Sequence, residues 1–229
     1  MKVILFGATG MVGQGVLREC LADPQVTAVL AIVRQSLGSL LHQGFAGQVN
    51  KLTEIVHKDF TNFTPIEKEL TGYDACFFCL GVSSVGMSEA AYRLVTYDLT
   101  LAAAQTLAKC NPGMTFIYVS GESTDSTEKG KVMWARVKGA TENALFQLPF
   151  KAAYMFRPGY IQTLDGIVTK VKLYRAFYAV IGPLYPLLKR LFPKHVTTTR
   201  QVGLAMIRVV RQGYGKKILG NHEINEIGS

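Results

Sequence analysis

The first thirteen residues place the strongest constraint on what this chain can fold into. Lys2 is followed by four apolar residues, as in a short buried strand, and glycines then stand at positions 7, 10 and 13. Between a strand and a helix, such glycines permit a tight turn, let a phosphate approach the backbone and let the helix pack closely on the strand. The helix start favours an anion through its free N–H groups and dipole. The sequence therefore predicts a dinucleotide-binding turn; the alternative is a tight turn without a ligand.

Apolar, strand-like runs alternate with helical patterns along the rest of the chain. Strands are predicted at residues 26–33, 52–57, 74–80, 115–119, 151–156 and 217–219, and helices at 11–22, 65–70, 89–109, 133–148 and 199–212. This alternation predicts an α/β fold with a Rossmann-like, doubly wound parallel sheet. Its ligand crevice is expected at the carboxyl ends of the strands. We expect one domain over residues 1–229, with residues 162–198 as an inserted lid or substrate region and a small helical lid towards the C-terminus.

The positive charge of the chain is concentrated in its last quarter. The formal net charge is +9, and residues 166–222 contain eleven Lys and Arg but no Asp or Glu. An anionic substrate, a phosphate-bearing cofactor or peripheral contact with an anionic membrane could use this segment, and the alternative is a solvated basic face. Its longest uncharged run, residues 176–188, is too short to span a bilayer. We expect no specific nucleic-acid partner, because the basic residues form no recognition motif.

Cysteine and histidine usage argues against a disulfide framework and against a metal site. Four cysteines are too few to staple a chain of 229 residues, and the four histidines show no metal-ligand spacing. Met1 leads directly into the first predicted strand, without the pattern of a secretory signal peptide. From this we expect a cytoplasmic protein.

Arg34 bears on which dinucleotide would bind. It ends the second predicted strand, where NAD-binding sheets usually carry an Asp or Glu that holds the ribose 2′-hydroxyl. An arginine there can instead pair with a 2′-phosphate, and no acidic residue lies between Asp23 and Glu54. The sequence thus predicts NADP(H) in preference to NAD(H), unless Arg34 is simply solvated at the strand end.

These features together carry a family resemblance. The resemblance rests on four segments, Gly7–Gly13, Cys79–Gly81, Val119–Ser120 and Arg157–Gly159, with less specific support from Val95–Asp98 and Val137–Gly139. The chain resembles the short-chain dehydrogenase/reductase superfamily in its atypical branch, which is the NAD(P)-binding epimerase/dehydratase-like family. Within that branch it is most similar to the oxidoreductase group of the Tat-interacting tumour suppressor.

The resemblance implies a catalytic set of Ser, Tyr and Lys with one departure. Ser120 and Lys138 match the serine and the lysine, but Trp134 stands at the tyrosine position. A phenol can exchange a proton beside a lysine, whereas an indole N–H only donates a hydrogen bond. The expected function is an oxidoreductase or isomerase acting on a small substrate that the sequence does not identify. The alternative is a catalytically impaired protein that senses NADP(H) or binds a partner or membrane. Other candidates for the proton donor are Tyr97, Tyr118, Tyr160 and Glu122.

The resemblance also implies a set of cofactor contacts around the strand ends. Asp59 and Phe60 would flank the adenine, and Lys138 would bond the nicotinamide ribose. For Phe60 and Ile161, simple packing at a strand end is the competing interpretation. The full predicted cofactor set is Gly7, Thr9, Gly10, Met11, Val12, Gly13, Arg34, Asp59, Phe60, Leu80, Gly81, Val82, Lys138, Pro158 and Ile161.

Overall fold

A parallel sheet forms the centre of the molecule. The computed structural model describes residues 1–38, 49–164, 166–167, 185, 190–192 and 195–229. Within them, seven strands pair in the order β3-β2-β1-β4-β5-β6-β9, and each of these pairings is parallel. The strands are β1 (Lys2–Phe6), β2 (Ala28–Val33), β3 (Leu52–Val56), β4 (Ala75–Phe78), β5 (Thr115–Val119), β6 (Ala152–Arg157) and β9 (Ile218–Gly220). The predicted doubly wound parallel sheet is confirmed.

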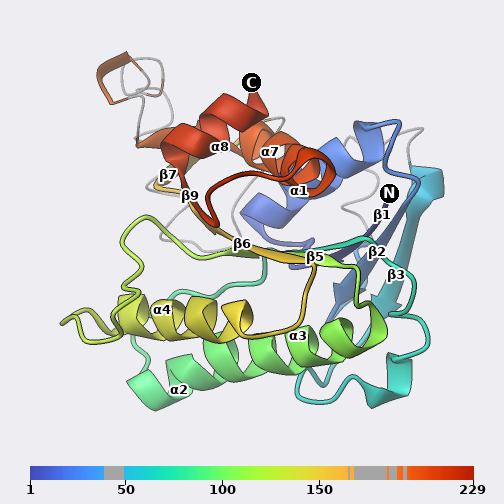
Figure 1. Cartoon of the computed structure of the whole chain (residues 1–229), viewed down its shortest axis with the longest axis horizontal. Coiled ribbons are helices and arrows are strands. Elements are labelled where there is room, and N and C mark those ends of the chain that lie inside the picture. Colours follow the sequence, from blue (N-terminus) through green and yellow to red (C-terminus); the bar gives the residue numbers. More distant parts are fainter. Residues whose placement is uncertain (39–48, 165, 168–184, 186–189, 193–194) are drawn as a thin grey trace.

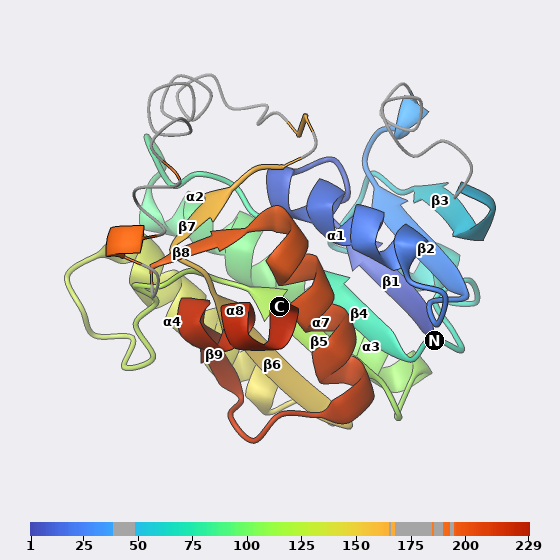
Figure 2. The ribbon, with the colours of Figure 1, turned by 90° about the horizontal axis from the view of Figure 1, so that it is seen from above.

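Helices cover both faces of this sheet (Figure 1). On one face lie α1 (Met11–Ala22), α7 (Thr199–Gln212) and α8 (Asn221–Gly228), and Figure 2 looks onto this layer. The other face carries α2 (Glu89–Arg93), α3 (Leu99–Cys110) and α4 (Met133–Phe146). The chain therefore forms three layers, with helices above and below the sheet.

The period-two pattern of the strands divides the core into two halves. In β1, Val3 and Leu5 join the core beneath α1 and α7, while Ile4 and Phe6 join the core beneath α3. Successive side chains of a strand point to opposite faces, so one apolar run supplies both halves. All four side chains are fully buried, which explains why this strand is a continuous apolar run.

Three expectations about local structure need correction. The helix expected at residues 89–109 is interrupted by a π-helical turn at Leu94–Asp98, which separates α2 from α3. The helix expected at 65–70 is reduced to a single 3-10 turn, Thr64–Ile66. The sequence did not predict β7 (Tyr160–Gln162), β8 (Val196–Thr198) or α8. Strands of three residues are too short to show a periodic pattern.

The predicted lid region is described only in part. β7 and β8 lie at the two ends of this region and pair with each other in a separate parallel ladder, in which Tyr160 lies opposite Val196. Most of residues 162–198, including most of the uncharged run at 176–188, lie outside the described residues. The ladder brings the chain back beside the end of β6 before α7 begins.

Candidate functional site

The glycine turn has the geometry that each of its glycines was expected to provide. Gly7 has φ +79°, and a Cβ there would lie 2.6–2.7 Å from the Cys79 and Leu80 backbone. The Gly10 N–H donates to the Gly7 carbonyl at 2.9 Å, and Gly10 is the exposed N-cap of α1. A Cβ on Gly13 would overlap the Gly7 carbonyl oxygen. The turn is therefore tight, and α1 packs directly on the end of β1.

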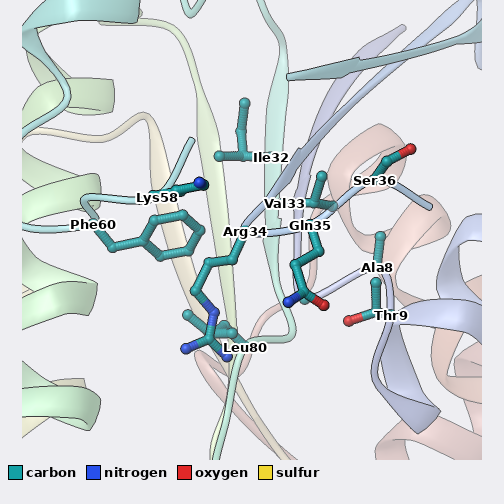
Figure 3. Close-up of a pocket in the computed structure, with 11 residues that line it drawn as sticks. Ala8, Thr9, Ile32, Val33, Arg34, Gln35, Ser36, Lys58, Phe60 and Leu80 are labelled. Carbon is teal, nitrogen blue, oxygen red and sulfur yellow. The ribbon is translucent and has the colours of Figure 1, made fainter. Parts of the chain in front are cut away.

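A cavity of about 680 Å³ opens beside this turn, at the carboxyl ends of β1, β2, β3 and β4. Figure 3 draws the side chains that line it. Five residues of the predicted cofactor set line the cavity: Gly7, Thr9, Arg34, Phe60 and Leu80. Adjacent parallel strands end at one edge of the sheet, which is where doubly wound folds bind their ligands.

Two cations lie at this cavity. Arg34 follows β2 and Lys58 follows β3, and both are exposed. Among the described residues, neither forms a hydrogen bond or an ion pair with a carboxylate, and the cavity lining contains no Asp or Glu. Nearby Glu54 accepts instead from the Ser36 hydroxyl at 2.6 Å and from the Leu37 N–H at 2.9 Å. The lining is therefore suited to an anionic group.

The remaining predicted cofactor residues lie outside this lining. Asp59 is exposed, and the Thr61 hydroxyl and N–H hold the pKa of its carboxyl below the ordinary value. Gly81 and Val82 are exposed just beyond β4, whereas Pro158 and Ile161 are buried beyond β6. Gly10, Met11, Val12 and Gly13 form the start of α1. The cofactor roles of these residues stay predictions.

At the end of β5, Ser120 and Lys138 lie close together, and the Ser120 hydroxyl is bonded to a buried carboxylate. The buried Ser120 hydroxyl donates to Glu142 Oε1 at 2.5 Å. Lys138 Nζ donates to the Ser120 carbonyl oxygen. The ring of Trp134 faces Gly121, where a Cβ would lie 3.7 Å from the ring. Thus Lys138 bonds the backbone carbonyl of Ser120 and not its hydroxyl, and the Ser120 hydroxyl is hydrogen-bonded to Glu142.

A buried ion pair fixes this arrangement. Glu142 has no exposed side-chain surface, and its Oε1 and Oε2 accept from Arg157 Nε at 3.0 and 3.2 Å. Arg157 Nη2 also contacts Glu142 Oε2 and donates to the Ser126 hydroxyl at 2.5 Å. Four donor contacts, including the one from Ser120, therefore satisfy a carboxylate that would be costly to bury alone.

Burial also affects Lys138. It lowers the pKa of the Lys138 ammonium to about 8 from its ordinary value of 10.5, against the negative charge of Glu142, which raises it. Between these two values the unfolded chain holds a proton that the folded protein lacks, so folding becomes more favourable as the pH rises. Below pH 8 the full cost of the buried charge is present.

A Lys138→Met variant should reveal this cost. Relative to that variant, the wild-type free energy of unfolding is expected to increase by about 1–2 kcal/mol between pH 7 and pH 9.5. Urea unfolding at both pH values measures the difference. The control is Lys68→Met, which removes an exposed lysine. The difference in free energy of unfolding between wild type and Lys68→Met should not change between the two pH values. Equal pH dependence in wild type and Lys138→Met would contradict the assignment.

The basic C-terminal quarter is partly neutralised by the rest of the molecule. Arg211 lies 3.3 Å from Asp23, and Lys216 lies 2.6 Å from Glu223. Arg208 donates to backbone carbonyls of the C-terminal helix, and Lys217 lies 4.3 Å from the Tyr154 ring centroid. No helix in the described part of the chain is long and apolar enough to cross a membrane. Peripheral membrane contact stays a prediction, because five of the eleven basic residues lie outside the described residues.

Comparison with known proteins identifies the group. No protein-family model matches the chain. A curated Emericella nidulans protein, "Protein fmp52, mitochondrial", is 31% identical over 163 residues, which cover 70% of this chain and 66% of that protein. Rattus norvegicus "Protein HTATIP2" is 28% identical over 158 residues, covering 69% and 62% of the two chains. The chain belongs to the atypical short-chain dehydrogenase/reductase group. The aligned part spans slightly less than two thirds of each relative.

Solved structures agree on the fold of this short-chain dehydrogenase/reductase. Gre2 from Candida albicans, solved in complex with NADPH, has a TM-score of 0.71 at 14% identity, covering 96% of this chain and 77% of Gre2. A Burkholderia thailandensis oxidoreductase of the short-chain dehydrogenase/reductase family has a TM-score of 0.67 at 15% identity, covering 96% and 90%. At these identities the likeness shows a shared NAD(P)-binding type of fold.

The relatives overturn the expected cytoplasmic location. The Emericella nidulans and Saccharomyces cerevisiae relatives are both named mitochondrial proteins, so that prediction is wrong. It rested on the missing pattern of a secretory signal peptide, and such a pattern does not distinguish the cytosol from a mitochondrion.

Sequence reasoning missed several residues of the site. Lys58 was detectable, because it follows a predicted strand just as Arg34 does. Glu142 follows Lys138 by one helical turn, which was a weaker signal. His195, whose Nδ1 contacts Glu122 Oε1, left no signal, since the two residues are 73 positions apart.

Proposed function

We propose that this protein is an NADP(H)-dependent oxidoreductase that reduces a carbonyl group of a small substrate. The observation that carries the proposal is the pair of cations, Arg34 and Lys58, without carboxylate partners among the described residues, in the cavity beside the glycine turn. A 2′-phosphate would satisfy both cations through charge-assisted hydrogen bonds. The exposed start of α1 would receive the pyrophosphate. Gre2 from Candida albicans, which has the same fold, was solved as a complex with NADPH, and this supports the same choice.

In the proposed complex, residues along this edge of the sheet have separate roles. Phe60 and Leu80, which line the cavity, would offer apolar surface to the adenosine, and Lys138, which donates to the Ser120 carbonyl beyond β5, would bond the nicotinamide ribose. When bound, the reduced cofactor supplies a hydride. What the chain itself adds is the position of the substrate oxygen and a source for the proton that this oxygen takes up.

Fluorescence titration with NADPH and NADH in parallel tests the cofactor assignment. The chain has one tryptophan, Trp134, whose energy transfer to a reduced nicotinamide reports binding. NADPH should bind more tightly than NADH, and Arg34→Ser should weaken NADPH binding by about 10- to 100-fold while leaving NADH affinity unchanged. Arg93→Ser, which removes an arginine stacked on Tyr97 away from the cavity, is the matched control. Equal affinities for both cofactors in wild type would refute the preference, and no binding of either would refute the function.

A second candidate function is an NADP(H)-binding protein without turnover. It is favoured by the arrangement at the end of β5, where Ser120 is bonded to Glu142 and Trp134 replaces the tyrosine. In that case NADPH binds, but no aldehyde or ketone accelerates its oxidation. The two candidates therefore differ in turnover and share the binding prediction.

A further inference from the structure

A carboxylate–imidazole pair lies beyond β5 and β6, near the residues just described. Glu122 follows Ser120 by two residues, and its N–H donates to the Pro158 carbonyl at 3.1 Å. Its Oε1 contacts Nδ1 of His195, the residue that precedes β8. The His195 carbonyl in turn accepts from the Tyr160 N–H at 3.0 Å. Backbone bonds thus hold both members of the pair against the turn that follows β6.

Gly159 makes the close approach of these groups possible. A Cβ at this position would overlap the Glu122 carboxylate and lie 2.9 Å from the His195 carbonyl oxygen. It would also lie 3.0 Å from Asn221 Nδ2. Asn221 Oδ1 accepts from the Gly159 N–H at 3.1 Å, while its buried Nδ2 has no hydrogen-bond partner among the described residues. The pair therefore lies in a polar cluster built from four separate parts of the chain.

Three side chains on or near β5, those of Trp134, Ser120 and Tyr118, are poorly suited to supply the proton. Trp134 cannot exchange a proton, and the Ser120 hydroxyl donates to buried Glu142. Burial raises the pKa of the Tyr118 hydroxyl far above its ordinary value. In contrast, the His195 side chain is 62% exposed and the Glu122 side chain 43% exposed. A Cβ on Gly121 would lie 3.7 Å from the Trp134 ring, and Glu122 is the next residue along the chain.

We propose that His195 supplies the proton in place of the missing tyrosine, and that Glu122 is its positioning residue. This inference rests on the proposed reductase function. The Glu122 carboxylate accepts a hydrogen bond from the Nδ1–H of the imidazole, which leaves Nε2 as the atom that exchanges protons. A carboxylate fixes the tautomer and orientation of a catalytic histidine in the same way in known catalytic triads. In the reductive step, the His195 Nε2–H bond breaks and an O–H bond forms on the substrate oxygen. Hydride from the cofactor, which is thereby oxidised, adds to the carbonyl carbon. The π electron pair of the C=O bond then moves to the oxygen that takes up the proton. Neutral His195 then takes a proton from solvent.

The first test compares two histidine variants. We expect His195→Gln to lower kcat for NADPH-dependent reduction of aliphatic aldehydes and α-dicarbonyls by about 100-fold or more, with the Kd for NADPH within about twofold of wild type. His222→Gln, which removes another exposed histidine, should keep wild-type kcat. Thermal unfolding confirms that both variants are folded.

The second test needs no substrate. In ¹⁵N-edited NMR spectra of the cofactor-free protein, neutral His195 should carry its proton on Nδ1. Glu122→Ala should shift it to the tautomer mixture shown by His222, a change that a purely structural role for Glu122 would not produce.

The outcomes separate the inference from the function on which it rests. Wild-type kcat in His195→Gln overturns the inference and leaves the reductase function standing. A wild-type protein that binds NADPH but reduces none of these aldehydes or α-dicarbonyls overturns the reductase function, and the inference with it, in favour of binding without turnover. An Nδ1–H tautomer that persists in Glu122→Ala overturns the role of Glu122. Failure of the wild type to bind NADPH overturns the reductase function itself.

Discussion

Replacing Arg157 with methionine is expected to destabilise the protein by about 3–5 kcal/mol. The Glu142 side chain is fully buried, and its ion-pair partner is Arg157, whose side chain is 15% exposed. Methionine has a similar length but no charge, so the variant leaves a buried carboxylate without compensation. The cost comes from that stranded charge, since burying a matched pair contributes little net stability by itself. Urea unfolding of wild type and variant measures the difference.

Two further variants test this explanation. Arg136→Met breaks an ion pair with Glu89 whose side chains are 24% and 50% exposed, and it should cost under about 1 kcal/mol. Adding Glu142→Gln to Arg157→Met should recover a large part of the loss, because the neutral amide can still accept from Ser120. If Arg157→Met costs no more than Arg136→Met, the buried pair is not what stabilises the end of β5.

Gly13→Ala is expected to cost about 3 kcal/mol or more. The added Cβ would overlap the Gly7 carbonyl oxygen and lie 2.6 Å from the carbonyl carbon. Both atoms belong to backbone held between β1 and α1, so no side chain can rotate to make room. In a protein of this size, the loss corresponds to a decrease in Tm of about 6–12 °C, measured by calorimetry or circular dichroism.

Gly81→Ala provides the matched control. Gly81 lies at the same edge of the sheet, yet a Cβ there would meet no heavy atom within 4 Å, so its Tm should stay within about 2 °C of wild type. Equal losses in the two variants would show that the effect of Gly13→Ala comes from lost glycine flexibility rather than from overlap with the Gly7 backbone.

Much of the cavity could be predicted from the sequence, because each signal lies within one strand and the turn after it. Gly7 and Arg34 each follow a run of apolar residues, and parallel strands bring their carboxyl ends to one edge. The end of β5 was harder to predict. The orientation of the Ser120 hydroxyl depends on Glu142, 22 residues away, and on Arg157, 15 residues further.

The sequence by itself determined the doubly wound sheet, the glycine turn and the positive charge beside it. These follow from local periodicity, from glycine conformation and from the rule that parallel strands end together. Only the tertiary structure decided which polar atoms meet at that edge. The Ser120 hydroxyl donates to Glu142, and His195, near the C-terminal end of the predicted lid region, contacts Glu122. Such contacts join residues tens of positions apart, and the packing of separate elements, which no local pattern records, sets their distances and directions.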